Sequence, residues 1–152
     1  MKQQELDMLD DEKLIWICVE PTVQKVRGKE PGIKSKVIKK LNDGQRALFL
    51  FQVLYGHADQ GISRFFLQIS YLVETTDIWS ALKSAMKYFD DTEMLGLIQK
   101  MEQAHHEVIR QNTNTISLDE LDKQYKERIP ATLKLIGSHI RNNPQVFMQF
   151  KD

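Results

Sequence analysis

Residues 57–68, HADQGISRFFLQ, hold the polar side chains that come nearest to an active site. His57 and Asp59 could act as a base and the carboxylate that orients it, and Gln60 and Arg64 follow closely enough to join them. No nucleophile, oxyanion donor or second acid stands at a spacing that would complete such a site. The alternative is a polar break between two buried helices. We favour the break and keep the four polar residues as candidate contacts with a partner.

A second candidate is a metal site in EQAHH, residues 102–106. Glu102 and His105 have the Glu-x-x-His spacing of carboxylate-bridged di-metal helical bundles. Such a site needs the motif from two helices and two further glutamates, whereas this chain holds one copy. His105 and His106 would point about 100° apart on a helix, so they cannot share one ion. We expect a core or half-buried histidine and no metal.

Nucleophilic and nucleotide chemistry have less support. The only thiol, Cys18, lies among Trp16, Ile17 and Val19, with no cation close by in sequence to lower its pKa. A buried structural cysteine is expected. The chain has no G-x-S-x-G turn and no glycine-rich phosphate-binding loop. We therefore expect no catalytic residue, no cofactor and no enzymatic activity.

Charge is balanced overall and polarised near the start of the chain. Basic and acidic residues number 21 each, so no global field favours nucleic acid or an anionic membrane. Residues 1–20 carry two basic and six acidic side chains, and residues 21–40 carry seven and one. Without interleaved aromatic residues, the second segment indicates a solvated face or a docking strip for an acidic partner, and nucleic-acid binding is a weaker alternative. Its basic residues are Lys25, Arg27, Lys29, Lys34, Lys36, Lys39 and Lys40.

Apolar residues recur at spacings of three and four and glycine is scarce, so the sequence predicts an all-α fold. We expect one compact domain over residues 1–152, with about seven to eight helices. The segment 45–55, QRALFLFQVLY, is apolar on nearly every side and should be the buried central helix. Pro21 and Pro130 are expected to begin helices. Residues 28–40 should form a basic loop or a short helix.

Short polar side chains and glycines mark the expected helix ends. Gly28 and Gly61 suit positions after a helix or in a turn, where positive φ is needed. The N-terminal stretch is too acidic for a secretory signal, and no apolar run approaches the ~20 residues that span a bilayer. We therefore expect a cytoplasmic protein. The residues expected to cap helices are Asn42 or Asp43, one of Thr75, Thr76 and Asp77, and Ser117.

Three stretches within about residues 41–150 carry a resemblance. LNDGQRALFLFQVLYG places a polar cap and an arginine before a long apolar run, and DQGISRFF places a glycine before paired aromatics. SHIRNNPQVF holds an isoleucine–arginine pair, a proline and a final phenylalanine, after a helix that begins SLDELDKQY. In these features the chain resembles the bacterial DNA-mimic-protein family, a group of small all-helical domains. The resemblance implies a shared helical fold and regulation of a protein partner.

The chain also departs from that family's pattern, at Ala58, Asp59, Gln60, Ile62 and Arg64. DNA mimicry requires a strongly negative surface, because a decoy must reproduce the field of the phosphates. A neutral chain could present such a surface only if the fold joins two acidic groups. These groups are Asp7, Asp10, Asp11 and Glu12, and Asp90, Asp91 and Glu93.

We therefore predict a non-enzymatic interaction module that regulates or inhibits an unidentified protein partner through a surface patch. The alternative is a small-ligand binder or an enzyme that uses the polar cluster at residues 57–64.

Overall fold

Short polar side chains begin most of the helices. A computed structural model describes residues 3–73, 77–110 and 117–148, which form helices and no strand, as the periodicity predicts. Five of these helices start at a side chain that accepts a hydrogen bond from the backbone N–H three residues ahead. Such caps satisfy donors that the first turn of a helix leaves unpaired. The capping residues are Asp10, Asn42, Asp77, Asp91 and Ser117.

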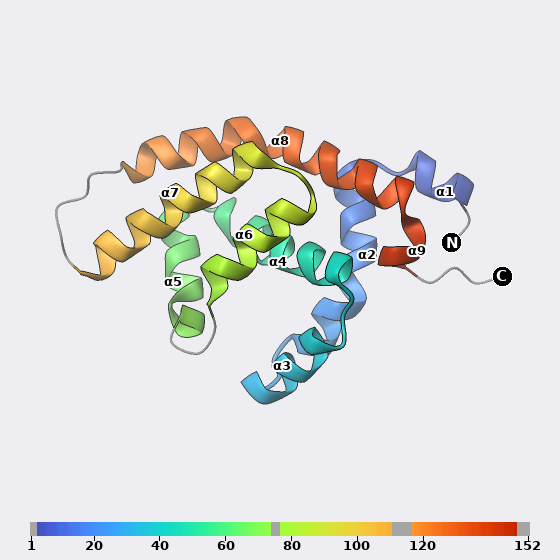
Figure 1. Ribbon diagram of the computed structural model, residues 1–152, viewed down its shortest axis with the longest axis horizontal. Helices are drawn as coiled ribbons and strands as arrows, with labels where there is room; N and C mark the ends of the chain where they lie inside the picture. The colour runs from blue at the N-terminus through green and yellow to red at the C-terminus, as the bar shows by residue number, and fades with distance from the viewer. Residues whose placement is uncertain (1–2, 74–76, 111–116, 149–152) are drawn as a thin grey trace.

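Nine helices follow one another in the described part of the chain (Figure 1). In order they are α1 Gln3–Met8, α2 Asp11–Val26, α3 Pro31–Lys39, α4 Asp43–Ala58, α5 Ile62–Val73, α6 Ile78–Tyr88, α7 Thr92–Ile109, α8 Leu118–Asn142 and α9 Pro144–Phe147.

Helix α4 is the centre of the core, as its sequence predicts. It packs against α2, α5, α6 and α9, and Leu48, Phe51 and Leu54 are almost wholly buried. The predicted apolar stripes of the following helices close around it. Their most buried members are Ile62, Phe65 and Ile69 of α5, Leu82 and Met86 of α6, Met94, Ile98 and Met101 of α7, and Ile136 and Ile140 of α8.

The predictions for the two prolines are wrong. Pro21 lies inside α2 and Pro130 lies inside α8, so each predicted pair of helices is one helix. A proline in a helix removes one backbone hydrogen bond and frees the carbonyl four residues earlier. Both prolines are exposed, so the freed carbonyl can bind water on the solvent side of the helix. The helix count over the described residues still reaches nine, because α1 and α9 form near the ends of the chain.

Helix α3 is the short basic helix that residues 28–40 were expected to allow. None of its residues is buried, whereas α2 contributes five residues to the core. Gly28 takes φ +71° after the end of α2, as expected for a glycine in this position. Figure 1 shows α3 beyond the main body of helices, at the far end of α2 from α1. No helix of the described residues is long and apolar enough to cross a membrane.

A close contact joins the start of α2 to α8. Arg141 of α8 donates to Asp11 Oδ1 at 2.6 Å and to the carbonyl of Leu9 at 2.7 Å. Gly137, one turn earlier on α8, leaves room for this pair, because a Cβ there would overlap the Asp11 carboxylate. The glycine is therefore required by packing and not by its backbone angles.

We predict that Gly137→Ala destabilises the protein by about 1–3 kcal/mol, because the added methyl displaces Asp11 from Arg141. Gly96→Ala on α7 is the matched control: its Cβ would meet nothing within 4 Å, so the better helix propensity of alanine should stabilise by up to about 1 kcal/mol. Urea unfolding of the two variants measures the difference. Equal effects of the two substitutions would show that the close approach at Gly137 is unimportant.

Candidate functional site

The turn between α4 and α5 carries the residues with candidate chemistry. His57, Asp59, Gln60 and Arg64 are all exposed. Gly61 takes φ +115° between the two helices, as expected for a turn. Within the described chain, no side-chain hydrogen bond or ion pair joins any two of the four polar residues. The geometry is that of a polar helix break.

The turn is held in place from α8. Asp122 Oδ1 accepts a hydrogen bond of 2.7 Å from the backbone N–H of Ile62, the first residue of α5. The carboxylate thus caps α5 from a different helix, 60 residues further along the chain. No local pattern in the sequence could indicate this contact.

Two tyrosines lie beside the turn, and sequence reasoning missed them. The Tyr55 hydroxyl donates to Glu12 Oε1 at 2.6 Å, which joins α4 to α2. Burial, the bond to Glu12 and the nearby charges of Glu12 and Asp59 raise the pKa of Tyr55. Burial also raises the pKa of Tyr125 on α8, with smaller contributions from Tyr55 and Asp59. Both phenols stay protonated at neutral pH, so neither can serve as a general base.

The Glu-x-x-His pair takes part in packing. Glu102 accepts a hydrogen bond of 2.7 Å from Lys83 Nζ. His105 is only 1% exposed, and its Nδ1 accepts from Trp79 Nε1 at 3.3 Å. Burial lowers the pKa of His105, which keeps the imidazole neutral. Among the residues whose placement is described, no three His, Cys, Asp or Glu side chains are arranged to hold a metal ion.

The lone thiol is also a core group. Cys18 faces inward from α2, and burial raises its pKa to about 12. Because the thiolate is the reactive form, this thiol is inert at neutral pH.

Asp91 is the most buried carboxylate among the described residues. Its side chain has no exposed surface, and it accepts hydrogen bonds from the backbone of Met94 at 3.0 Å, from Arg128 at 2.8 Å and from Thr132 at 2.6 Å. Arg128 also pairs with the exposed Glu93 at 3.1 Å. These bonds join the turn before α7 to α8, so the network is structural.

The same pairs involve the two acidic groups from which a DNA-like face would have to be built. Asp11 is paired with Arg141, and Asp91 and Glu93 with Arg128. The two acidic groups approach α8 from α2 and from α7, and each meets an arginine there. Three of the seven carboxylates are thereby neutralised.

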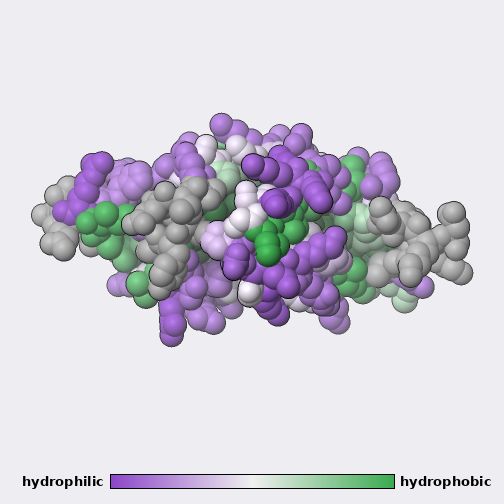
Figure 2. Space-filling view, turned by 90° about the horizontal axis from the view of Figure 1, so that it is seen from below, coloured by the Kyte–Doolittle hydropathy of each residue, from purple (hydrophilic) through white to green (hydrophobic). Residues whose placement is uncertain are grey.

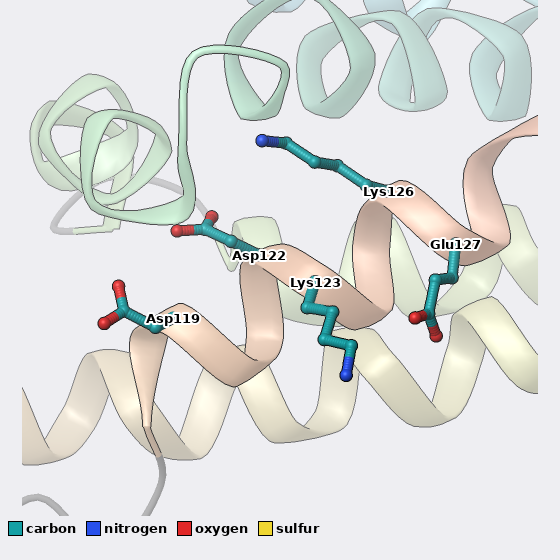
Figure 3. A pocket seen from close by; sticks show the side chains of 5 residues that line it. All are labelled: Asp119, Asp122, Lys123, Lys126 and Glu127. Carbon is teal, nitrogen blue, oxygen red and sulfur yellow. The ribbon is translucent and has the colours of Figure 1, made fainter.

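A shallow hollow lies on α8 (Figure 3). The side chains that line it all come from this one helix and include both signs of charge. Figure 3 shows that Lys123 and Glu127 point to a different side of the helix from Lys126. The charged groups therefore do not converge on one ligand. The lining residues are Asp119, Asp122, Lys123, Lys126 and Glu127.

The largest unbalanced charge is at the end of α2 and on α3. We call this region the basic arm, and its residues are Lys25, Arg27, Lys29, Lys34, Lys36, Lys39 and Lys40. Five ion pairs are found in the described parts of the chain, and none uses a residue of the arm. Ile33 on α3 is 45% exposed, and Val37 and Ile38 of the same helix are half-buried. Figure 2 shows hydrophobic surface bordered by hydrophilic surface on the side of the molecule where α3 lies.

Comparison of the chain with protein-family models, with curated proteins and with solved structures gives no match. Its function must therefore be inferred from its own side chains.

We predict that Asp91→Ala destabilises the protein by about 3–5 kcal/mol, because Arg128 is left as a partly buried charge and Thr132 loses its acceptor. Glu93→Ala removes the other partner of the same arginine. Since the Glu93 side chain is 74% exposed, this control should cost less than about 1 kcal/mol. Urea unfolding separates the two values. Similar losses would contradict a special role for the buried carboxylate.

Burial of neutral His105 predicts a pH dependence of stability. Its pKa is lowered on folding, so below about 6.5 the unfolded chain binds the proton more readily. Stability is complete above that pH and falls as the pH drops through it, with a slope of up to about 1.4 kcal/mol per pH unit. His105→Gln should flatten the pH dependence of the free energy of unfolding between pH 7.5 and about pH 5.5. If the free energy of unfolding of His105→Gln falls with pH as steeply as that of the wild type, His105 is not the group responsible.

Proposed function

We propose that this protein is a non-enzymatic interaction module of the bacterial cytoplasm that regulates or inhibits a protein partner, and that it binds the partner through the basic arm. The observation that carries the proposal is the concentration of seven basic residues without ion pairs in the described structure. Cations this close together repel one another, and a partner of opposite charge relieves that repulsion.

The chemistry of the arm favours an acidic protein over nucleic acid. Six of its seven basic residues are lysines, whose ammonium groups attract carboxylates with little demand on geometry. The exposed face of α3 adds an aliphatic contact through Ile33. Residues 25–40 contain no aromatic side chain on which a base could stack. Carboxylates combined with apolar side chains are therefore the best complement.

Two other hypotheses receive less support. A small-ligand site or active site at residues 57–64 needs its side chains to converge, and these four are exposed and unconnected. From the resemblance to DNA-mimic proteins, the proposal keeps the regulation of a protein partner. We do not include a DNA-like acidic surface, because Asp11, Asp91 and Glu93 are paired with arginines.

Neutralising α3 should abolish partner capture. The test variant replaces Lys34, Lys36, Lys39 and Lys40 by serine. The control replaces an equal number of exposed lysines elsewhere, namely Lys100, Lys123, Lys126 and Lys134. We expect at least one protein to be captured from nuclease-treated host lysate by the wild type and the control, and to fall at least about tenfold with the α3 variant, as measured by quantitative mass spectrometry.

Two results would contradict the proposal. One is equal capture by the two lysine variants. The other is capture that occurs in untreated lysate and is lost after nuclease treatment, which would assign the arm to nucleic acid.

A further inference from the structure

The exposed face of α2 carries a stripe of residues that the core does not use. Lys13, Trp16, Ile17, Glu20 and Gln24 recur at steps of three and four, so they lie along one side of the helix. Trp16 is 38% exposed, whereas the other tryptophan of the chain, Trp79, is 2% exposed. Tryptophan gains more from burial than most side chains and is enriched at the energetic centres of protein interfaces. The stripe therefore has the apolar anchor of a contact surface.

The charges of this stripe are complementary to the same stripe read backwards. Lys13 precedes Trp16 by three residues, and Glu20 follows Ile17 by three. When a second α2 lies antiparallel, with the two-fold axis between Trp16 and Ile17, Lys13 of each copy faces Glu20 of the other. An isologous interface requires this kind of self-complementarity.

Neither charge is used within one chain. Lys13 and Glu20 form no ion pair in the described structure, and Glu20 accepts a hydrogen bond only from Gln24, at 3.0 Å. Both are therefore available to a second copy.

The segments at the two ends of α2 carry opposite net charge. Residues 1–20 carry an excess of four negative charges, and residues 21–40 an excess of six positive charges. Figure 1 shows α1 and α3 at opposite ends of α2. The 16 residues of α2 span about 24 Å, more than two Debye lengths at physiological salt, so the ends barely interact within one chain.

Antiparallel packing brings these opposite ends together, whereas parallel packing would oppose like charges. The acidic residues around the start of α2 include the exposed Asp7 of α1 and the capping residue Asp10, and these would meet Lys25 and Arg27 of the second copy. Nucleic acid or an anionic membrane would meet the acidic half of the same surface and be repelled. The charge pattern therefore fits a second copy of this chain better than a polyanion.

We infer that two copies of this chain associate through antiparallel α2 helices, with Trp16 near the two-fold axis, reciprocal Lys13–Glu20 pairs beside it, and the basic arm of each copy against the acidic start of the other. The inference rests on the proposed function, because it names one protein partner of the same arm. Self-association would also place part of the arm out of reach of other partners.

Sedimentation velocity of purified protein over a range of concentrations tests the inference at low and at physiological salt. The wild type should form dimers, with affinity that weakens as salt rises. Lys13→Glu and Glu20→Lys each place like charges opposite one another twice, so each should raise the dissociation constant at least about tenfold. Mixing the two singly substituted proteins restores opposite charges at both positions, and a heterodimer should form.

The double variant K13E/E20K should dimerise like the wild type, and Lys100→Glu on α7 is a control that should change nothing. Circular dichroism checks that each variant is folded. Acrylamide quenching of Trp16 should fall as wild-type dimers form, while buried Trp79 stays protected throughout.

A wild type that stays monomeric at millimolar concentration and low salt would overturn the inference. So would two single variants that fail to associate when mixed. In either case, continued capture of a lysate protein through α3 would leave the proposed function standing, because that experiment uses other substitutions.

Discussion

The fold depends on the longest helix, α8, because its side chains pair polar groups that other segments bring toward the core. Arg128 pairs with buried Asp91, Arg141 pairs with Asp11, and Asp122 caps α5 at Ile62. A buried polar group left without a partner costs about 1–3 kcal/mol, and a buried charge costs more. Helix α8 thus fixes the positions of α2, of the α4–α5 turn and of the start of α7. The apolar surfaces of α4 and its neighbours can then pack as one core.

Because these polar groups have structural roles, few of them remain as candidates for a functional site. The metal-ligating and nucleophilic candidates each have a structural partner or a buried place. Glu102 is paired with Lys83, His105 is bonded to Trp79, and the Cys18 thiol is buried. The basic arm is different, because seven basic residues gather there with one acidic residue, Glu30, among them. The stripe of α2 is different because it leaves Trp16 38% exposed. We therefore propose that the protein acts through surface contact.

Local patterns predicted the helices and the core well. The Asn42, Asp77 and Ser117 caps, the turn at Gly61 and the burial of α4 all follow from residue type and spacing. Of the alternatives named for these caps, Thr75 and Thr76 lie outside the described residues. The predictions for the prolines were wrong, because the sequence does not reveal that both lie on the exposed side of a helix, where water can bind the freed carbonyl.

The ties between distant helices could not be predicted. Asp122 and Ile62 are 60 residues apart, and Arg141 and Asp11 are 130 apart. No periodicity connects residues at such separations. The candidate residues His57, Asp59, Gln60 and Arg64 show the converse: their proximity in sequence suggested a cluster, but they are exposed around a turn whose side chains do not meet. The exposed Trp16 was also missed, because its apolar neighbours Leu14, Ile15, Cys18 and Val19 belong to the core.

Chemical footprinting with diethyl pyrocarbonate, which modifies both lysine and histidine, tests whether the basic arm is the surface that binds a partner. Modification in intact host cells should be compared, by mass spectrometry, with modification of dilute purified protein. We expect the lysines of the basic arm to be protected in cells while His57 stays as reactive as in the purified protein. Protection of His57 with fully reactive arm lysines would contradict it and move the functional surface to the α4–α5 turn.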